Sequence, residues 1–353
     1  MIAGSPRILV VRLSAIGDVV RALPALQVLR ERYPRAQIDW VVEAKSAAIP
    51  EGHPALDELI VFDRRPKTWQ SSRQFIALCR DIRNKRYDIV VDFHGIMKSG
   101  LLAAASRAPE RYGFARPRSR EGSSLFYTHR VKLPGTRINR SEENYLLCKA
   151  IAPDSIWPSP TLYVPLDAQD TVDAFFESAF EGGKLVVALH APVDRPEKQW
   201  PLRHFATLAD LLMADGRFEV MLTWGPGQLS IAHAVLAMTR RNPIIAPETP
   251  DLKHYAWLVH KAAVYVGGDT GPMHIAAAMG TPVVAIFGGT DPVQHAPFQL
   301  PHAVLYSGAP GPHASVSHAT AQARLEAITP DAAYEACVKL VASSHSPHPA
   351  RSA

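Results

Sequence analysis

Residues 264–291 (VYVGGDTGPMHIAAAMGTPVVAIFGGTD) constrain the fold more than any other stretch of the chain. Their pattern predicts a strand at 264–266, a helix at 273–279 and a second strand at 283–287. A helix that is entered from a strand through Gly and Thr presents unpaired backbone N–H groups and the positive end of its dipole. Such a helix end suits a pyrophosphate. The pattern alone leaves an equal alternative, in which Asp269 and Thr270 only cap the helix.

The same alternation of strand and helix runs along most of the chain. Repeated βα units predict doubly wound α/β sheets, and 353 residues are long for a single core. A Pro-rich segment at 153–165 separates two series of units, so we expect two domains with ligands in the cleft between them. The expected strands lie at residues 7–13, 38–42, 58–62, 89–91, 184–189, 218–223, 243–245, 264–266 and 283–287.

The predicted organisation is two Rossmann-like domains, residues 1–160 and 161–325, followed by two short segments. The first segment, residues 326–345, contains a C-terminal helix with Thr329 as its N-cap and Pro330 at its first position. We expect this helix to pack back on the first domain. The second segment, residues 346–353, is expected to be a disordered tail.

Polar side chains follow the carboxyl ends of several expected strands, which is the edge where open α/β sheets bind ligands. Asp18 stands at a helix entrance, where a carboxylate can take a proton from a hydroxyl nucleophile or simply serve as an N-cap. Lys198 lies on a loop and offers a point charge to a phosphate, although loop lysines are usually only solvated. Gln228 follows a Trp-Gly turn at the same edge. His94 has no partner at metal-ligand spacing, which favours a hydrogen-bonded structural histidine.

Missing features exclude several classes of protein. No apolar run approaches the roughly 20 residues of a membrane span, and no signal peptide is predicted. Cys79, Cys148 and Cys337 are odd in number and lie in apolar contexts, which favours free thiols in a reducing cytoplasm. GxGxxG after the first strand, GxxxxGK[ST] and GxSxG are all missing, which argues against dinucleotide, P-loop and hydrolase chemistry. Without a D-x-D element, we expect a metal-independent mechanism with no cofactor.

The net charge of +5 is modest but unevenly distributed. Between Arg107 and Arg140 nine Arg or Lys stand against two Glu. Such a block is either a solvated face or a surface for an anionic partner such as phosphate, nucleic acid or the inner leaflet of a membrane. Nucleic acid is the weaker alternative, because zinc-finger, ribonucleoprotein and helix-turn-helix spacing are missing.

Several motifs together point to one family. They are RILVVRLSAIGDVVRALPAL, YDIVVDFHGIMKSGLLA, REGSSLFY, the K-x-W-P element at 198–201 and GGDTGPMHIAAAMGTPVV. With these motifs the chain resembles the bacterial ADP-heptose:lipopolysaccharide heptosyltransferases, inverting enzymes of the GT-B fold. The REGSSLFY segment is similar to heptosyltransferase I, which adds the first heptose to Kdo-lipid A.

The resemblance implies a role for each candidate residue. Asp18 matches the general base that deprotonates the acceptor hydroxyl. The implied donor site holds the pyrophosphate with Thr270 and Gly271, neutralises it with Lys198, and contacts the sugar and phosphate region with Asp269 and His274. Arg64, Arg65 and Arg120 match the basic residues for the anionic Kdo and phosphate groups. The implied partners are ADP-heptose, Kdo-lipid A and the inner face of the inner membrane, where the enzyme is peripheral, and not nucleic acid.

The sequence also departs from the family pattern. Gln228 stands where a Glu usually holds the donor ribose, Pro192 and Val193 replace phosphate-loop threonines, and Asn139 replaces an acceptor-side histidine. These departures leave open another donor or acceptor. Two further alternatives remain, a nucleotide-sugar epimerase of the same fold and a non-catalytic binding protein.

Overall fold

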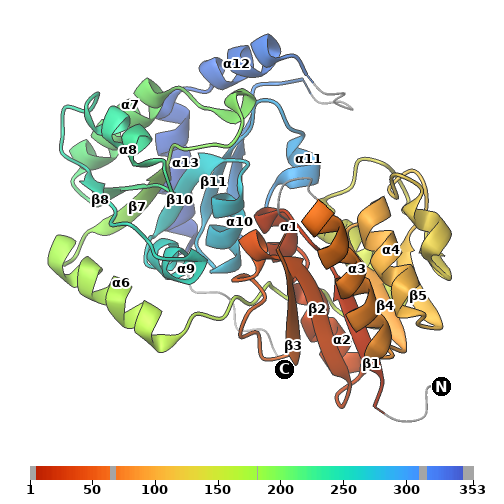
Figure 1. The fold of residues 1–353 in the computed structure, drawn as a ribbon. Helices are drawn as coiled ribbons and strands as arrows, with labels where there is room; N and C mark the ends of the chain where they lie inside the picture. Colours follow the sequence, from red (N-terminus) through yellow and green to blue (C-terminus); the bar gives the residue numbers. More distant parts are fainter. Residues whose placement is uncertain (1–4, 64–68, 181, 310–315, 345–353) are drawn as a thin grey trace. The chain divides into compact units, whose positions relative to one another are not determined.

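The computed structural model describes residues 5–63, 69–180, 182–309 and 316–344. The chain divides into two compact units, Met1–Tyr163 and Val164–Ala353. Each unit holds one six-stranded sheet with helices on its faces (Figure 1). The domain boundary expected after residue 160 lies in the same Pro-rich segment as the division at Tyr163.

The first unit is a parallel sheet with the strand order β3-β2-β1-β4-β5-β6, which is the order of the Rossmann fold. Its elements are β1 (Arg7–Val11), α1 (Ile16–Val20), α2 (Pro24–Arg32), β2 (Gln37–Glu43), η1 (Ala44–Ser46), β3 (Glu58–Phe62), α3 (Trp69–Asn84), β4 (Ile89–Asp92), α4 (Met97–Ser106), β5 (Glu110–Phe114), η2 (Ser123–Phe126), β6 (His129–Val131) and α5 (Arg140–Lys149).

The second unit repeats this topology, because its order β9-β8-β7-β10-β11-β12 is again third, second, first, fourth, fifth and sixth along the unit. All of its strand pairs are parallel. The predicted fold of two doubly wound Rossmann-like units is therefore confirmed. The elements are α6 (Leu166–Ala179), β7 (Leu185–His190), η3 (Pro196–Lys198), α7 (Leu202–Asp215), β8 (Phe218–Thr223), α8 (Leu229–Leu236), β9 (Ile244–Ile245), α9 (Leu252–His260), β10 (Val264–Gly268), α10 (Gly271–Ala278), β11 (Val283–Ile286), α11 (Pro292–His295), β12 (His302–Leu305), α12 (His318–Ala327) and α13 (Pro330–Ser344).

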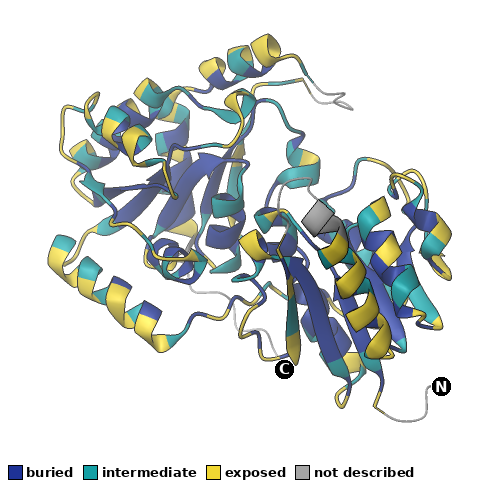
Figure 2. Ribbon diagram, viewed as in Figure 1, coloured by how far each residue is buried: buried dark blue, intermediate teal, exposed yellow. Residues whose placement is uncertain are grey.

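The central strands are buried on both faces, as parallel sheets covered by helices require (Figure 2). Ile8, Leu9, Val10 and Val11 of β1 are all fully buried. Each such side chain contributes about 1.5–3 kcal/mol relative to leaving it in water. The apolar runs that predicted strands are thus the runs that form the two cores.

The sequence pattern missed three short strands and one helix break. β5, β6 and β12 carry charged or half-exposed residues rather than an apolar run, so their pattern resembled a loop. The expected helix after Asp18 is divided into α1 and α2, and Pro24 is the first residue of α2. Proline lacks an N–H and clashes with the preceding turn, which makes it acceptable only at a helix start.

The C-terminal helix α13 does not pack as expected. It begins at Pro330, and Thr329 caps it through a bond from the Ala332 N–H to the Thr329 hydroxyl at 3.2 Å. Its buried residues, however, join the core of the second unit, and the helix packs against strands β10, β11 and β12 and helix α7 (Figure 1). The expectation that residues 326–345 cover the first domain is therefore wrong, because Cys337 and its apolar neighbours complete the second sheet's own core. The tail expected to be disordered, residues 346–353, lies outside the described residues.

Two expectations from composition concern thiols and membrane spans. Cys79, Cys148 and Cys337 are free thiols, as predicted, and the last two are buried. Across the described ranges, no helix combines the length and the hydrophobicity needed to cross a membrane.

Candidate functional site

Both sheets reverse their strand order at one point, and Asp18, Lys198 and Asp269 follow strands that lie at these points. In the first sheet β1 and β4 are neighbours, with Val11 opposite Asp92. In the second sheet β7 and β10 are neighbours, with His190 opposite Gly267. Loops leave such strands in opposite directions and open a crevice at the carboxyl edge, which is where doubly wound folds bind ligands.

In the first unit, Asp18 is held by two arginines that the sequence pattern did not single out. Arg12 Nη2 lies 2.5 Å from Asp18 Oδ2, and Arg21 Nη1 lies 2.9 Å from Asp18 Oδ1. The N-cap of α1 is Ala15, so the interpretation of Asp18 as that helix's N-cap is wrong. The Asp18 side chain remains 33% exposed, whereas both arginines are buried. The two buried arginines therefore orient the carboxylate, part of which remains exposed.

Arg12 is anchored beneath this carboxylate. Its Nη1 donates to the carbonyl of Phe93 at 2.6 Å, and its own carbonyl accepts the indole N–H of Trp40 at 3.1 Å. Burial lowers the pKa of the Arg12 guanidinium, while the nearby Asp18 opposes that shift. An arginine keeps its charge in proteins, so Arg12 supplies a fixed positive group at the base of the site.

His94 lies next to this group and is uncharged. Its Nδ1 accepts the backbone N–H of Leu13 at 3.3 Å. Burial, reinforced by the positive charge of Arg12, lowers the pKa of His94 to about 3. The prediction of a hydrogen-bonded structural histidine is thus confirmed, and the neutral ring adds no positive charge beside Asp18.

In the second unit, the first part of the segment 264–291 forms β10, a turn and α10. Thr270 takes the N-cap position with extended backbone (φ −135°), and Gly271 and Pro272 form the first turn. The Thr270 hydroxyl donates back to the carbonyl of Gly268 at 3.4 Å instead of capping the helix. The interpretation in which Asp269 and Thr270 merely cap α10 is therefore not supported. The first N–H groups of α10 have the arrangement that an anion requires.

Lys198 is fixed at this helix end by Asp269. Its Nζ donates to the Asp269 carbonyl at 2.6 Å and to Oδ2 at 2.8 Å, while His274 Nε2 lies 3.5 Å from Oδ1. Asp269 and His274 are buried, and Lys198 is partly exposed. Lys198 thus has a fixed position rather than being only solvated. Asp269 and His274 lie beneath it and support it.

The loop that carries Lys198 approaches β10 closely. A Cβ atom on Gly268 would lie 3.1 Å from the Lys198 carbonyl and 3.5 Å from Val193 Cγ1. A Cβ on Gly289 would lie 3.2 Å from the Glu197 carbonyl. Gly268 at the end of β10 and Gly289 after β11 therefore allow η3 to pack directly on the sheet edge.

The remaining donor candidate, Gln228, sits on the loop after β8. It is the N-cap residue of α8, its N–H donates to the Gly225 carbonyl at 2.9 Å, and it is half-buried. A Cβ on Gly225 would lie 3.0 Å from Gln228 Oε1, so the amide folds over the turn. Trp224 before it is locked by its indole bond to the Ala246 carbonyl at 2.8 Å.

The other departures from the family pattern have local structural roles. Asn139 is the N-cap of α5, and its Oδ1 accepts the Ser141 N–H at 2.9 Å. Pro192 is buried beside Val193, which packs near Gly268 as described above. Asn139 is therefore occupied by helix capping, and Val193 offers an apolar contact where a threonine would offer a hydroxyl.

The acceptor candidates are only partly described. Arg120 is exposed, and its backbone N–H donates to the Gly95 carbonyl at 2.8 Å, which places it at the carboxyl edge of β4 in the unit that holds Asp18. Arg64 and Arg65 lie outside the described residues. Arg118, which was not singled out, ion-pairs with the buried Glu143 at 2.5 Å and donates to the His94 carbonyl at 3.3 Å.

The sequence reasoning missed Arg12 and Arg21, although each carries a signal. Arg12 interrupts an otherwise apolar buried strand run, and Arg21 lies three residues after Asp18 on a helix, where side chains meet. A charged residue in a buried run needs a partner, so the pair was open to prediction.

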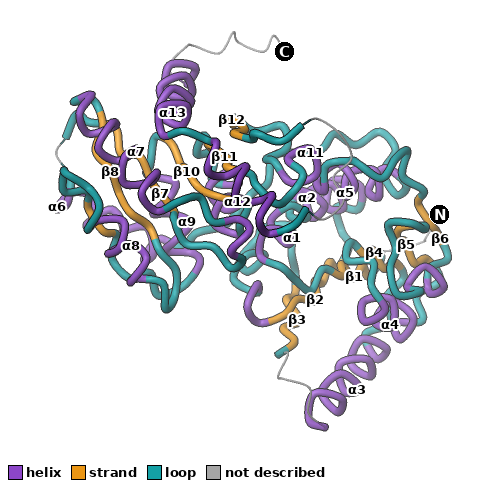
Figure 3. Tube along the Cα trace, turned by 90° about the horizontal axis from the view of Figure 1, so that it is seen from above, coloured by secondary structure: helices purple, strands orange, loops and turns teal. Residues whose placement is uncertain are grey.

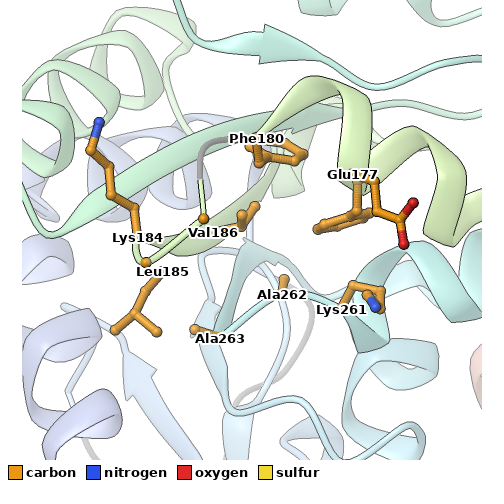
Figure 4. Close-up of a pocket in the computed structure, with 11 residues that line it drawn as sticks. Glu177, Phe180, Lys184, Leu185, Val186, Lys261, Ala262 and Ala263 are labelled. Carbon is orange, nitrogen blue, oxygen red and sulfur yellow. The ribbon is translucent and has the colours of Figure 1, made fainter.

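A hollow elsewhere in the second unit is separate from these residues. It has a volume of about 610 Å³ and is lined by Phe176, Phe180, Lys184, Lys261 and their neighbours (Figure 4). It lies at the amino end of β7, whereas Lys198 and Asp269 follow the carboxyl ends of β7 and β10. Within the described ranges, no group of three or more His, Cys, Asp or Glu side chains could hold a metal ion.

Comparisons with known proteins show the family of the chain. Residues 75–321 match the model of glycosyltransferase family 9 (heptosyltransferase). The lipopolysaccharide heptosyltransferase 1 of Escherichia coli O18:K1:H7 is 30% identical over 81% of this chain and 87% of its own length.

Two solved structures share the fold. The family 9 glycosyltransferase of Veillonella parvula has a TM-score of 0.83 at 23% identity and covers 97% of this chain and 99% of its own. The E. coli heptosyltransferase WaaC with ADP-2-deoxy-2-fluoro heptose has a TM-score of 0.71 at 24% identity, covering 93% and 98%. The resemblance inferred from the motifs is thereby confirmed. The chain belongs to glycosyltransferase family 9, the heptosyltransferase family, and is a glycosyltransferase.

Proposed function

We propose that this enzyme transfers L-glycero-D-manno-heptose from ADP-heptose to Kdo-lipid A in lipopolysaccharide core synthesis, with inversion at the anomeric carbon. Family membership supports heptosyl transfer, and the similar E. coli enzyme is a lipopolysaccharide heptosyltransferase 1. The single observation that carries the proposal is Lys198, fixed by Asp269 at the start of α10. The position suits a diphosphate leaving group.

The donor half of the proposed reaction relies on three kinds of group. An ammonium has three N–H donors, and two of those on Lys198 go to Asp269, so the third can reach a phosphate oxygen. The N–H groups around Thr270 and Gly271 add partial positive charge at the helix end. Both stabilise the charge that develops on ADP as the bond from the anomeric carbon to the diphosphate oxygen breaks.

The acceptor half relies on Asp18. Its carboxylate takes the proton of the acceptor hydroxyl while that oxygen attacks the anomeric carbon from the side opposite ADP. Arg12 and Arg21 contact different carboxylate oxygens and so orient the group. The Asp18 side chain is also 33% exposed, so that an acceptor hydroxyl can approach it.

We further propose that the acceptor is lipid-linked and that the enzyme acts at the inner face of the inner membrane. The basic block from Arg107 to Arg140, with Arg120 at the carboxyl edge of its sheet, supports an anionic acceptor. ADP is the expected product, and helix dipole and Lys198 together offer charge compensation for it without a metal. Activity should therefore persist in excess EDTA.

The test is to incubate the purified enzyme with ADP-heptose and Kdo-lipid A and to measure ADP release and the mass of the acceptor. One heptosyl unit should be added per ADP released, and NMR of the product should show inverted anomeric configuration. A characterised heptosyltransferase run in parallel shows that the substrates are competent.

The same assay separates the alternatives. ADP-heptose that is consumed or isomerised at the same rate without acceptor would indicate an epimerase. If the enzyme transferred a sugar only from a different nucleotide sugar, the donor would have to be reassigned. Gln228, in place of the usual Glu, keeps this alternative open. Binding of donor and acceptor without any turnover would leave a non-catalytic binding protein.

A further inference from the structure

Helix α3 carries an exposed stripe that combines arginines with an isoleucine. Arg73, Ile76, Arg80 and Arg83 are spaced by three and four residues, so they lie along one face of the helix. All four are exposed, and the Ile76 side chain is 58% accessible. The helix buries its other face through residues such as Ile82 in the core of the first unit.

Further exposed apolar side chains lie on α4, which packs against α3, and on η2, which packs against α4. Met97 and Leu101, one turn apart on α4, are 38% and 39% exposed, and Leu125 of η2 is 72% exposed. A Cβ on Gly122 would lie 3.7 Å from Met97 Cε and 3.9 Å from Leu125 Cδ1, so these two side chains meet beside Gly122. Helices α3 and α4 lie side by side and cover the same face of the sheet (Figures 1 and 3).

We name these residues together the α3–α4 surface. It comprises Arg73, Ile76, Arg80, Arg83, Met97, Leu101 and Leu125. It carries three arginines and no acid, and the one acid of helix α3 is the exposed Asp81. Glu121 is the acid next to Met97, and it accepts the Met97 N–H at 3.2 Å.

Cations and large apolar side chains on one face are the two features that hold an amphipathic helix at an anionic bilayer. The arginines pair with lipid phosphates, and the apolar side chains enter the boundary between headgroups and acyl chains. A solvated face explains the arginines but not the exposed Ile76 on the same helix face or the exposed Leu125 of η2, because apolar groups gain nothing in water. We propose that the α3–α4 surface docks on an anionic lipid bilayer.

Docking at this surface would serve the base in the same unit. The loop that leads into η2 contacts the carboxyl end of β4 through the bond from Arg120 N–H to the Gly95 carbonyl. Asp18 follows the neighbouring strand β1 at the same sheet edge. The inference rests on the proposed function in one respect, namely that the acceptor headgroup is presented at a bilayer. Binding to lipid itself needs neither donor nor acceptor.

The experiment measures partition of the full chain onto vesicles that contain no glycolipid. Vesicles of phosphatidylcholine with phosphatidylglycerol should bind the enzyme, vesicles of phosphatidylcholine alone should not, and binding should weaken as salt rises. The double variant Ile76→Glu/Leu125→Glu should lower partition at least about tenfold, from lost apolar burial and added negative charge. Arg80→Gln should lower it about fivefold, the effect of one interfacial cation.

A matched control keeps the test specific. Leu166, at the start of α6 in the second unit, is 73% exposed, and Leu166→Glu should leave partition unchanged. Unaltered thermal unfolding of each variant shows that the fold is retained. Equal loss in Leu166→Glu, binding that ignores phosphatidylglycerol, or a double variant that loses affinity for a single-stranded oligonucleotide but not for vesicles would overturn the proposal.

Failure of the inference and failure of the proposed function are distinguishable. Transfer to a water-soluble acceptor fragment without vesicle binding would reject only the docking surface. Vesicle binding through the α3–α4 surface without any heptosyl transfer would reject only the function.

Discussion

Arg12 and Arg21 donate to opposite oxygens of Asp18, at 2.5 and 2.9 Å. The two guanidiniums come from the end of β1 and from the turn after α1, so the carboxylate is fixed from both sides. Arg12 is itself held by the Phe93 carbonyl, and the Arg21 carbonyl accepts the Asn144 amide at 3.1 Å. A preoriented carboxylate loses little freedom when a substrate hydroxyl arrives.

Asp18→Asn is expected to abolish most turnover. The amide cannot accept a proton, and general base catalysis contributes about 10²–10⁴-fold. Affinity for the donor, measured by calorimetry with ADP, should remain within about threefold, because the donor candidates belong to the second unit. Turnover within tenfold of the unmodified enzyme would exclude Asp18 as the base.

Arg21→Gln tests the electrostatic part of this arrangement. An adjacent positive charge favours the ionised form of a carboxylate, so its removal makes Asp18 protonate at higher pH. The acid limb of the kcat/KM profile should therefore move to higher pH, with activity near neutrality reduced less than at pH 5. The pH–rate profile is the measurement.

A control for this variant is Arg217→Gln, which removes the same charge from an ion pair with Asp215 in the second unit. It should leave the acid limb in place. A profile of unchanged shape in Arg21→Gln would mean that Arg21 only supports the fold.

The site was predictable from sequence where a residue type and a strand end coincide. Asp18, Lys198 and Asp269 each follow a central strand. Doubly wound sheets bind ligands at the carboxyl ends of these strands. Arg12 was missed because it lies within the largely apolar run 7–13, which predicts a buried strand, and the partner that a buried charge requires was not considered. Which side chains pair across the site depends on distances that spacing does not encode.

Lys198→Met should lower the thermal stability, kcat and the affinity for ADP. It leaves Asp269, whose side chain is 6% exposed, without its ammonium partner, and breaking a buried pair costs about 3–5 kcal/mol. The double variant Lys198→Met/Asp269→Asn removes both charges and should recover much of the thermal stability while kcat and ADP affinity stay low. Recovery of activity together with stability would mean that Lys198 has no role toward the donor.

His190 predicts a loss of stability in acid. Its Nδ1 lies 3.0 Å from the Thr223 hydroxyl, and complete burial lowers the pKa of the ring to about 3. Between pH 6.5 and 3 the unfolded chain binds a proton that the folded chain does not, so the free energy of unfolding falls as pH falls. The slope should be up to about 1.4 kcal/mol per pH unit for this group.

Urea unfolding at several pH values from 4 to 7 measures this slope. His190→Gln should lower stability at pH 7 through altered packing but make it less dependent on pH. A steeper dependence in the variant would contradict the assignment. His94, with a pKa also lowered to about 3, contributes a second such dependence in the first unit.

The parts of the fold that sequence could not predict are those set by packing rather than by local pattern. Residues of β6 and β12 have weak strand character alone and become strands because a neighbouring edge offers hydrogen bonds. The position of α13 depends on which sheet face still lacks cover. The amphipathic pattern around Cys337 shows that one face is buried, but not against which domain.

Gly268→Ala tests the close approach of the Lys198 loop to β10. The new Cβ would lie 3.1 Å from the Lys198 carbonyl, which belongs to the backbone and has little room to move. The η3 loop must shift by a few tenths of an ångström, and the Lys198 ammonium, bonded to the Asp269 carbonyl at 2.6 Å, shifts with it. We expect kcat/KM for the donor to fall about tenfold or more, since small misplacements of positioned groups are costly. The free energy of unfolding should fall by about 1–3 kcal/mol.

Gly135→Ala is the control, because its Cβ would meet nothing within 4 Å. Adding Val193→Ala should not restore the kinetics of Gly268→Ala, because it relieves only the 3.5 Å contact with Val193. If Gly268→Ala left the donor kinetics unchanged, the position of the Lys198 loop would not matter for donor use.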